Sequence, residues 1–252
     1  MCMAGRRFIP SQVVCGCALV GYLSSVGPCF GQVSDADRAK PVMSSTAVDT
    51  ADETPGKRIF GIIPNYRTSP SLKNYEPISA KAKFKIAAQD AFDPGTAALA
   101  AAFAGEGQVA NSEPAFGQGV RGYAHYWVTA YSDFVIGDFM TESIYPTILH
   151  QDPRYFRKGR GSGLARLGYA CGQIFWTHND NGTTGFNYSE VGGNATAVAI
   201  GLSYYPNDRD AGDAISQLGT QLAVDMASNV LKEFWPDIAH KLHHHNQTSQ
   251  SH

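Results

Sequence analysis

The sequence predicts a single, mainly α-helical domain with Gly/Ala-rich helix interfaces, following an N-terminal signal and a disordered spacer. With 43% hydrophobic and 17% charged residues among 252, the chain has the composition of a globular protein. Several segments carry apolar residues at helical spacing between N-cap residues, glycines and prolines. Small residues also recur at intervals of three or four, which lets helix backbones approach closely.

Residues 1–31 are interpreted as an export signal peptide. Arg6 and Arg7 supply the positive charge, and residues 13–27 form an apolar stretch that is shorter than the roughly 20 residues of a membrane span. We expect cleavage between Gly31 and Ser34, although a retained anchor is an alternative. Only Cys171 follows this segment, so the exported chain would have no internal disulfide.

The polar residues 32–57 lack apolar periodicity and predict a disordered spacer, so the helical domain is expected to cover 58–239. Residues 59–64 fit either a short strand or an extended packing arm, because Pro64 and Pro70 are compatible with both. A flexible, His-containing tail is expected at 240–252.

The expected helices cover residues 79–91, 93–104, 116–145, 164–177, 193–205 and 211–234. Ser79 is the expected N-cap of the first, and Asp93 followed by Pro94 starts the second. Glycines 105 and 107 should end that helix. Pro146 should end or kink the third, and Pro236 should bound the last.

Three sets of small residues are predicted to be packing surfaces: Gly119, Gly122, Ala130, Asp133 and Gly137; Gly193, Ala197 and Gly201; and Gly219, Ala223 and Ala227. A membrane-embedded bundle is disfavoured, because the longest helical segment carries charges such as Arg121 and Glu142, whose insertion into lipid is costly. Packing in a soluble core is the preferred interpretation, with peripheral membrane contact as the alternative.

A basic, glycine-rich loop is the strongest candidate binding site. Five cationic residues fall within thirteen positions: Arg154, Arg157, Lys158, Arg160 and Arg166. Flexible backbone N–H groups and the start of the following helix would favour a phosphate or carboxylate. The alternative is a solvated loop paired with acidic residues of neighbouring helices. The loop is not a Walker motif, because no lysine precedes a serine or threonine.

The remaining candidates concern catalysis and metals. His150 with Asp152, or His178 with Asp180, could act in acid–base chemistry, but the Gly-x-Ser-x-Gly nucleophile motif is absent. The loop around Gly182 fails the calcium-loop pattern. His240, His243 and His244 have metal-ligand spacing, but we interpret them as tail residues that bind metals only adventitiously. No metal or cofactor is therefore expected.

The motifs GIIPNY at 61–66, LHQDPRYFR at 149–157, FNYSE at 186–190 and Gly193-Asn194 resemble a family of exported proteins from soil bacteria, especially acidobacteria. The resemblance spans about 58–238 and implies a location in the bacterial envelope, either in the periplasm or associated with the outer membrane. It implies no activity and no site residues.

These observations predict an exported envelope protein of structural or binding type that contacts anionic lipid head groups through the basic loop. The alternative is a hydrolase of an envelope lipid or phosphoester that uses His150 and Asp152. A net charge of −2 disfavours a nucleic-acid partner, which requires an excess of Lys and Arg. The oligomeric state is left open.

Overall fold

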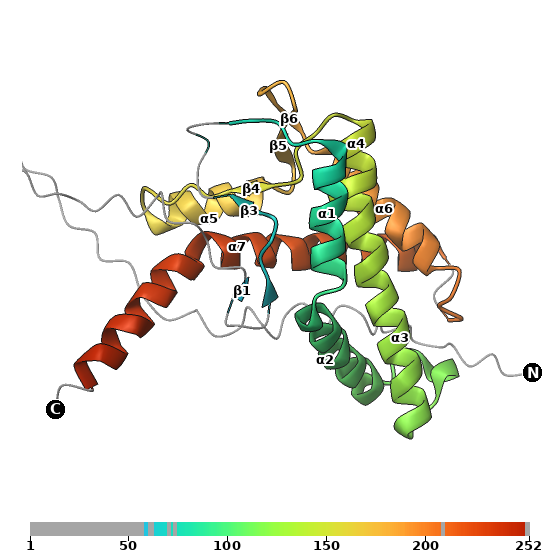
Figure 1. The fold of residues 1–252 in the computed structure, drawn as a ribbon. Helices are drawn as coiled ribbons and strands as arrows, with labels where there is room; N and C mark the ends of the chain where they lie inside the picture. The colour runs from blue at the N-terminus through green and yellow to red at the C-terminus, as the bar shows by residue number, and fades with distance from the viewer. Residues whose placement is uncertain (1–57, 60–62, 70–71, 73–74, 208–209, 250–252) are drawn as a thin grey trace, which may run out of the picture.

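A computed structural model describes residues 58–59, 63–69, 72, 75–207 and 210–249, and these residues form a mainly helical domain (Figure 1). The expected signal peptide and spacer lie outside the described residues. No helix among those described combines the length and the apolar character needed to cross a bilayer.

Two consecutive helices begin at the predicted caps. The first, α1 (Ala80–Ala91), has Ser79 as its N-cap, and Asp93 caps α2 (Pro94–Ala110) by accepting a bond from the Gly95 N–H. The predicted end of α2 at residue 104 is wrong, because the helix continues through both glycines. A Cβ at Gly107 would lie 3.1 Å from the Tyr126 ring, so the missing side chain permits close packing on the next helix.

The third helical segment begins and ends three residues later than predicted and changes its hydrogen-bond pattern. A short 3-10 turn, η2 (Pro114–Phe116), precedes α3 (Gly119–Asp138), which continues as a π-helix, η3 (Phe139–Ile144), and then as α4 (Tyr145–Ile148). Pro146 was expected to end or kink this segment. It lies two residues after the π-helical turn, in the first turn of α4, and the helical segment ends at Ile148.

The region after residue 163 departs most from the predicted helices. Helix α5 (Gly163–Gly172) ends early, because β5 (Trp176–His178) pairs antiparallel with β6 (Thr184–Phe186). Helix α6 (Tyr188–Gly201) begins five residues before the predicted start, since the Asn187 side chain accepts a bond from the Glu190 N–H and caps it.

The last helix, α7 (Ala211–Ser249), passes through Pro236, so its predicted end before that residue is wrong. A proline inside a helix removes the bond to the carbonyl four residues before it, which here belongs to Lys232. The neighbouring Glu233 carbonyl accepts from Arg157 Nε at 2.9 Å and from Arg166 Nη2 at 2.7 Å. These two side chains bind the helix next to the point where proline interrupts its own bonding.

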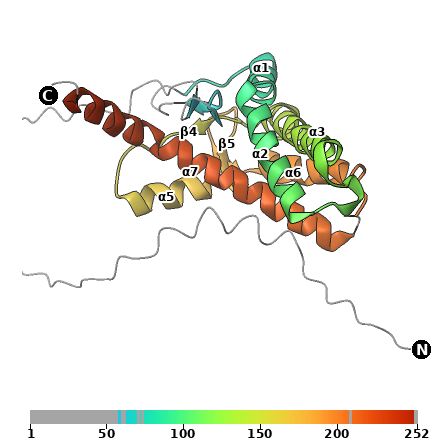
Figure 2. The ribbon, with the colours of Figure 1, turned by 90° about the horizontal axis from the view of Figure 1, so that it is seen from below.

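Short strands attach the N-terminal segment to the helices. Strand β1 (Arg58–Ile59) pairs antiparallel with β2 (Ile63–Pro64), and β3 (Thr68–Ser69) pairs in parallel with β4 (Tyr155–Phe156). Helix α7 crosses the molecule, with α1 and α3 to one side and α5 to the other (Figures 1 and 2). We call the described residues 58–59 and 63–69 the N-terminal arm. The arrangement of the helices brings this arm, α6 and α7 together at the centre of the domain.

Two of the three predicted small-residue surfaces have members at close contacts. A Cβ at Gly193 would lie 2.9 Å from a Thr141 methyl carbon, so α6 packs tightly on η3, and a Cβ at Gly122 would collide with the Gly117 carbonyl. The third prediction is wrong, because Gly219, Ala223 and Ala227 are exposed. Helix α7 turns its opposite side inward to place polar residues such as Lys232 and Glu233.

Candidate functional site

The centre of the basic loop is occupied by a carboxylate of the protein itself. Glu233 is fully buried, and its Oε1 accepts from Arg166 Nε at 2.8 Å and from the Gly159 N–H at 2.9 Å. Its Oε2 accepts from the Tyr155 hydroxyl at 2.8 Å and from the Lys158 N–H at 2.9 Å. The backbone and guanidinium donors that the sequence suggested for an external anion therefore bind Glu233.

Two of the predicted cationic residues complete this internal network. Arg157 Nη2 lies 2.8 Å from one oxygen of Asp237, and Arg166 Nη1 lies 2.6 Å from the other. The Arg166 guanidinium also lies over the Phe234 ring, at 4.5 Å from its centroid. Both arginines are buried, so they join the loop and α5 to α7.

Arg154 belongs to a separate group of side chains. It binds Asp152 through two nitrogens, with Nη2 at 2.6 Å from Oδ2 and Nε at 3.0 Å from Oδ1. It also donates to the Glu76 carbonyl and lies over the Phe156 ring. The five predicted residues therefore do not converge on one point.

The other two cationic residues, Lys158 and Arg160, are exposed. Lys158 Nζ lies over the Tyr169 ring, at 5.6 Å from its centroid. Both residues precede α5, at the end of the loop where that helix begins. They are the part of the predicted anion site that reaches the surface.

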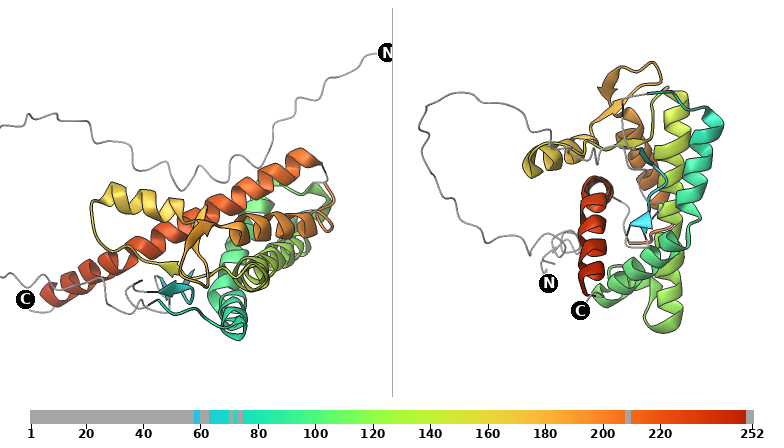
Figure 3. Two further views of the ribbon diagram at one scale, coloured as in Figure 1. Left: turned by 90° about the horizontal axis from the view of Figure 1, so that it is seen from above. Right: turned by 60° about the vertical axis from the view of Figure 1, so that its left-hand side comes forward.

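Beside these charges, α5 presents an apolar face to solvent, which the sequence reasoning missed. Leu164 is 83% exposed and Leu167 is also exposed, whereas Arg166 between them turns inward. Figure 3 shows α5 at the edge of the molecule, next to α7. The positions 164, 167 and 171 recur at helical spacing, and this pattern could have identified an amphipathic helix.

Exposed aromatic side chains lie just after α5 and at the start of α6. Trp176 is 53% exposed and Tyr188 is 61% exposed, and both rings contact Phe186. Phe175 is exposed as well. We call Leu164, Leu167, Phe175, Trp176 and Tyr188 the apolar residues of the α5 region.

The structure pairs the candidate catalytic residues differently from the sequence hypothesis. His150 is exposed, and its Nδ1 lies 4.0 Å from Asp180 Oδ2, while Asp152 is held by Arg154. His178 lies near Asp152 instead; burial lowers the pKa of His178, and the Asp152 charge opposes that shift. Asp180 is bound by the buried Lys83, at 2.8 Å. Neither proposed His–Asp pair is therefore a hydrogen-bonded dyad.

A second concentration of charge lies at the centre of the domain. Arg67 Nη2 lies 2.6 Å from Glu190 Oε2, and Arg67 Nη1 lies 3.5 Å from Glu142 Oε1. The Asn194 amide donates to Asp225 at 2.9 Å. Asp90, Asp138 and Lys232 lie close enough to interact electrostatically with this group.

The carboxyl groups of this cluster favour protonation. Burial, followed by the charge of Asp90, raises the pKa of Glu142 well above its usual range, and the same two causes act on Asp138. Burial and the charge of Glu190 raise the pKa of Asp225 to about 7. These carboxyl groups outnumber Arg67 and Lys232, so the cluster carries more acid than base.

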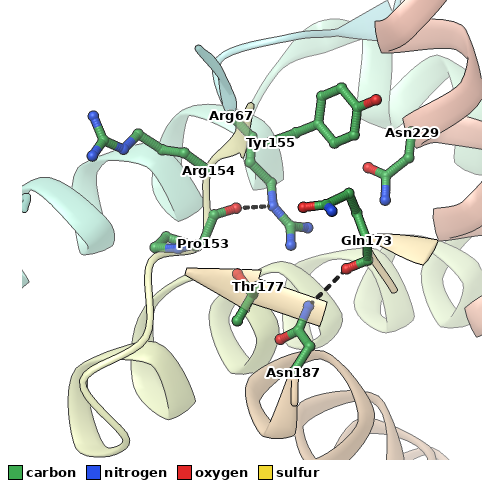
Figure 4. A pocket seen from close by; sticks show the side chains of 8 residues that line it. All are labelled: Arg67, Pro153, Arg154, Tyr155, Gln173, Thr177, Asn187 and Asn229. Atoms are coloured by element: carbon green, nitrogen blue, oxygen red, sulfur yellow. Dashed lines mark hydrogen bonds between the residues drawn. The ribbon is translucent and has the colours of Figure 1, made fainter. Parts of the chain in front are cut away.

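A small polar cavity adjoins the cluster. Its volume of about 10 Å³ corresponds to roughly one water molecule. Figure 4 shows its lining: Arg67, Pro153, Arg154, Tyr155, Gln173, Thr177, Asn187 and Asn229. Among the described residues, no three His, Cys, Asp or Glu side chains are arranged to hold a metal ion. The side chains of His243 and His244 lie outside the described part.

Comparison with family models, curated proteins and solved structures gave no match.

Proposed function

We propose that this chain is an exported envelope protein of binding type that associates peripherally with an anionic lipid surface. The contact is made by the beginning of α5, the preceding residues Lys158 and Arg160, and the aromatic residues that follow the helix. The observation that carries this proposal is the orientation of α5: Arg166 is buried against Glu233, while Leu164 and Leu167 face solvent.

The exposed leucines are suited to the boundary between head groups and acyl chains. A helix that lies in this boundary has an apolar side toward the chains and cationic groups nearby. Burying one leucine side chain contributes about 1.5–3 kcal/mol, and each nearby basic residue about 1 kcal/mol. Leu164, Leu167, Lys158 and Arg160 together would support reversible binding.

The aromatic residues support the same orientation. Tryptophan and tyrosine favour the membrane interface because each combines an apolar ring with a polar group. Both residues are exposed: Trp176 begins β5, four residues after the end of α5, and Tyr188 begins α6. They would provide a second point of contact with the same lipid surface.

Co-sedimentation with vesicles tests the proposal. Vesicles containing phosphatidylglycerol should pellet the wild-type protein more than vesicles of phosphatidylcholine alone, and added salt should weaken the binding because it screens exposed charges. Replacing Leu164 and Leu167 with glutamine should reduce the pelleted fraction several-fold. A matched control replaces Val109 and Val120, which are also highly exposed but lie on α2 and α3.

A second pair of variants separates charge from apolar contact. The double variant Lys158→Gln, Arg160→Gln should lose binding and salt dependence, whereas Lys81→Gln, Lys85→Gln should retain both, because these exposed lysines lie on α1. Arg157 is left unchanged, since it pairs with Asp237 inside the protein. Equal sedimentation of the leucine variant and its valine control would contradict the proposal.

A further inference from the structure

We propose that the polar cavity between the N-terminal arm, the end of α5 and α7 binds one monatomic anion, chloride. Its lining comes from segments that are distant in the chain, so a bound ion would link them. The inference is independent of the proposed lipid contact, because none of the residues assigned to that contact lines the cavity.

The first argument is the supply of hydrogen-bond donors. The side-chain amides of Gln173 and Asn229 line the cavity beside the Arg67 guanidinium (Figure 4). Asn229 is 7% exposed, and no group of the described residues bonds to either amide. A buried polar group without a partner costs free energy. A ligand in the cavity would supply that partner to both amides.

Arg67 contributes further donors. Its Nε donates to the Pro153 carbonyl, its Nη2 lies 2.6 Å from Glu190 Oε2, and its Nη1 lies 3.5 Å from Glu142 Oε1. A guanidinium has more N–H groups than these contacts use, and it stays charged at every ordinary pH. The cavity therefore adjoins a permanent cation and two amides that can each turn an NH2 group inward.

The second argument is the sign of the charge in the lining. Among the described residues that line the cavity, none is Asp or Glu. Arg154 directs its guanidinium away from the cavity and pairs with Asp152, so Arg67 supplies the positive charge (Figure 4). Burial raises the pKa of the nearby Glu142 well above its usual range, so this group favours its neutral form and repels an anion little. Such a lining favours an anion over a cation.

The third argument is size. The volume of about 10 Å³ admits one atom of roughly the size of a water molecule. A phosphate or carboxylate group exceeds this space, whereas chloride is only slightly larger than water and needs nothing but donors. Water is the competing occupant, and the chloride dependence of folding separates the two.

A bound chloride would hold three parts of the domain together. Arg67 belongs to the N-terminal arm, Gln173 follows α5 directly as its C-cap, and Asn229 lies on α7. Only folding brings these groups to one place. Chloride should therefore bind the folded protein and not the unfolded chain, which stabilises the fold by mass action.

Thermal unfolding of the full chain tests the proposal. Sodium chloride replaces sodium gluconate stepwise at constant ionic strength, because gluconate is too large for the cavity. The unfolding midpoint of the wild type should rise by several degrees, in proportion to the logarithm of the chloride concentration once the site is mostly occupied. An equal midpoint in the two salts would overturn the proposal and leave water as the occupant.

Two variants of one residue assign the effect to the cavity. Asn229→Asp places a negative charge in the lining, and Asn229→Leu fills the space with an apolar side chain. Each should lose the chloride-dependent rise. The two salts are compared within each variant, so a change in basal stability does not affect the result. Persistence of the rise in either variant would show that chloride binds elsewhere and would overturn the proposal.

Matched controls separate the cavity from the rest of the surface. Asn111→Asp adds the same charge at an exposed position and should keep the full rise. The double variant Lys158→Gln, Arg160→Gln should keep it as well, because these exposed cations belong to the lipid proposal and do not line the cavity. Loss of the rise in either control would show that net or surface charge governs the response, which would contradict a chloride site in the cavity.

Nuclear magnetic resonance provides a second measurement. Exchange with a protein site broadens the signal of free chloride. The broadening should be larger for the wild type and Asn111→Asp than for Asn229→Asp. Equal broadening by all three proteins would contradict the proposal.

Discussion

Arg166 of α5 and Glu233 of α7 form an ion pair in which Nε and Oε1 lie 2.8 Å apart. The same carboxylate binds the Tyr155 hydroxyl and two backbone N–H groups, and it is fully buried. The pair thus fixes α5 and the basic loop to the last helix, and it determines which side of α5 remains exposed.

The first prediction concerns this pair. Glu233→Gln should lower the unfolding free energy by about 3–5 kcal/mol, because the buried Arg166 would keep only the partly exposed Asp237 as a counter-charge. Urea denaturation followed by circular dichroism measures the change. Asp237→Asn should cost less than half as much, since the Asp237 side chain is 37% exposed. Equal losses for the two variants would show that burial of Glu233 is not the cause.

The second prediction compares two glycines of α2. Gly105→Ala should stabilise the protein by about 1 kcal/mol, because alanine favours a helix and a Cβ there meets nothing within 4 Å. Gly107→Ala should not stabilise it, since its Cβ would crowd the buried Tyr126 ring. Thermal unfolding of both variants in the same buffer tests the difference. Stabilisation by both would mean that Tyr126 can move aside.

The third prediction concerns the packing of α6. Ala197 is buried between Gly193 and Gly201, so Ala197→Leu should overpack the contact and cost about 1–3 kcal/mol. Ala199→Leu is the matched control, because residue 199 lies on the same helix but is exposed. Chemical denaturation of the two variants provides the comparison. An unchanged midpoint for Ala197→Leu would indicate that this face of α6 is not tightly packed.

The fourth prediction concerns pH. The pKa of Asp225 rises from 3.8 to about 7 on folding, so its proton is bound more tightly by the folded state. Both states are protonated below the lower value, and the stability contributed by this proton is lost as the pH rises through 7. Asp225→Asn should therefore stabilise the protein near pH 8 by about 2–4 kcal/mol, and by less near pH 5.

Unfolding midpoints at both pH values test this effect of Asp225. Glu76→Gln, which alters an exposed residue, should show no such difference between the two conditions. An equal change near pH 5 and near pH 8 for Asp225→Asn would point to a packing effect rather than to titration.

Local signals in the sequence correctly located the beginnings of two helices. Ser79 and Asp93 cap α1 and α2 as predicted, because an N-cap depends on bonds within a single turn. The ends were less predictable. Gly107 and Pro236 disfavour helix by local propensity, yet α2 and α7 continue through them; Gly107 packs against Tyr126, and Arg157 binds the Glu233 carbonyl near Pro236.

The candidate site was predictable in its residues but not in its connections. The sequence identified a cationic, glycine-rich loop, and the structure places those residues beside acidic partners that are distant in the chain, chiefly Glu233 and Asp237. A pairing over some seventy positions leaves no local pattern. The central cluster around Arg67 was missed for the same reason, since its members come from the N-terminal arm and from four separate helical segments, α1, α3 with η3, α6 and α7.

The sequence by itself determined the helical class, the positions of the first helix starts and the small-residue contact at Gly193, because these depend on local hydrogen bonding and side-chain size. Only the tertiary structure decided which charges are neutralised and which remain at the surface. Arg166 and Lys158 are both cationic residues of the predicted anion site, but Arg166 is buried against Glu233 whereas Lys158 is exposed. The reason is physical: the state of a charge depends on the groups that folding brings within a few ångströms of it.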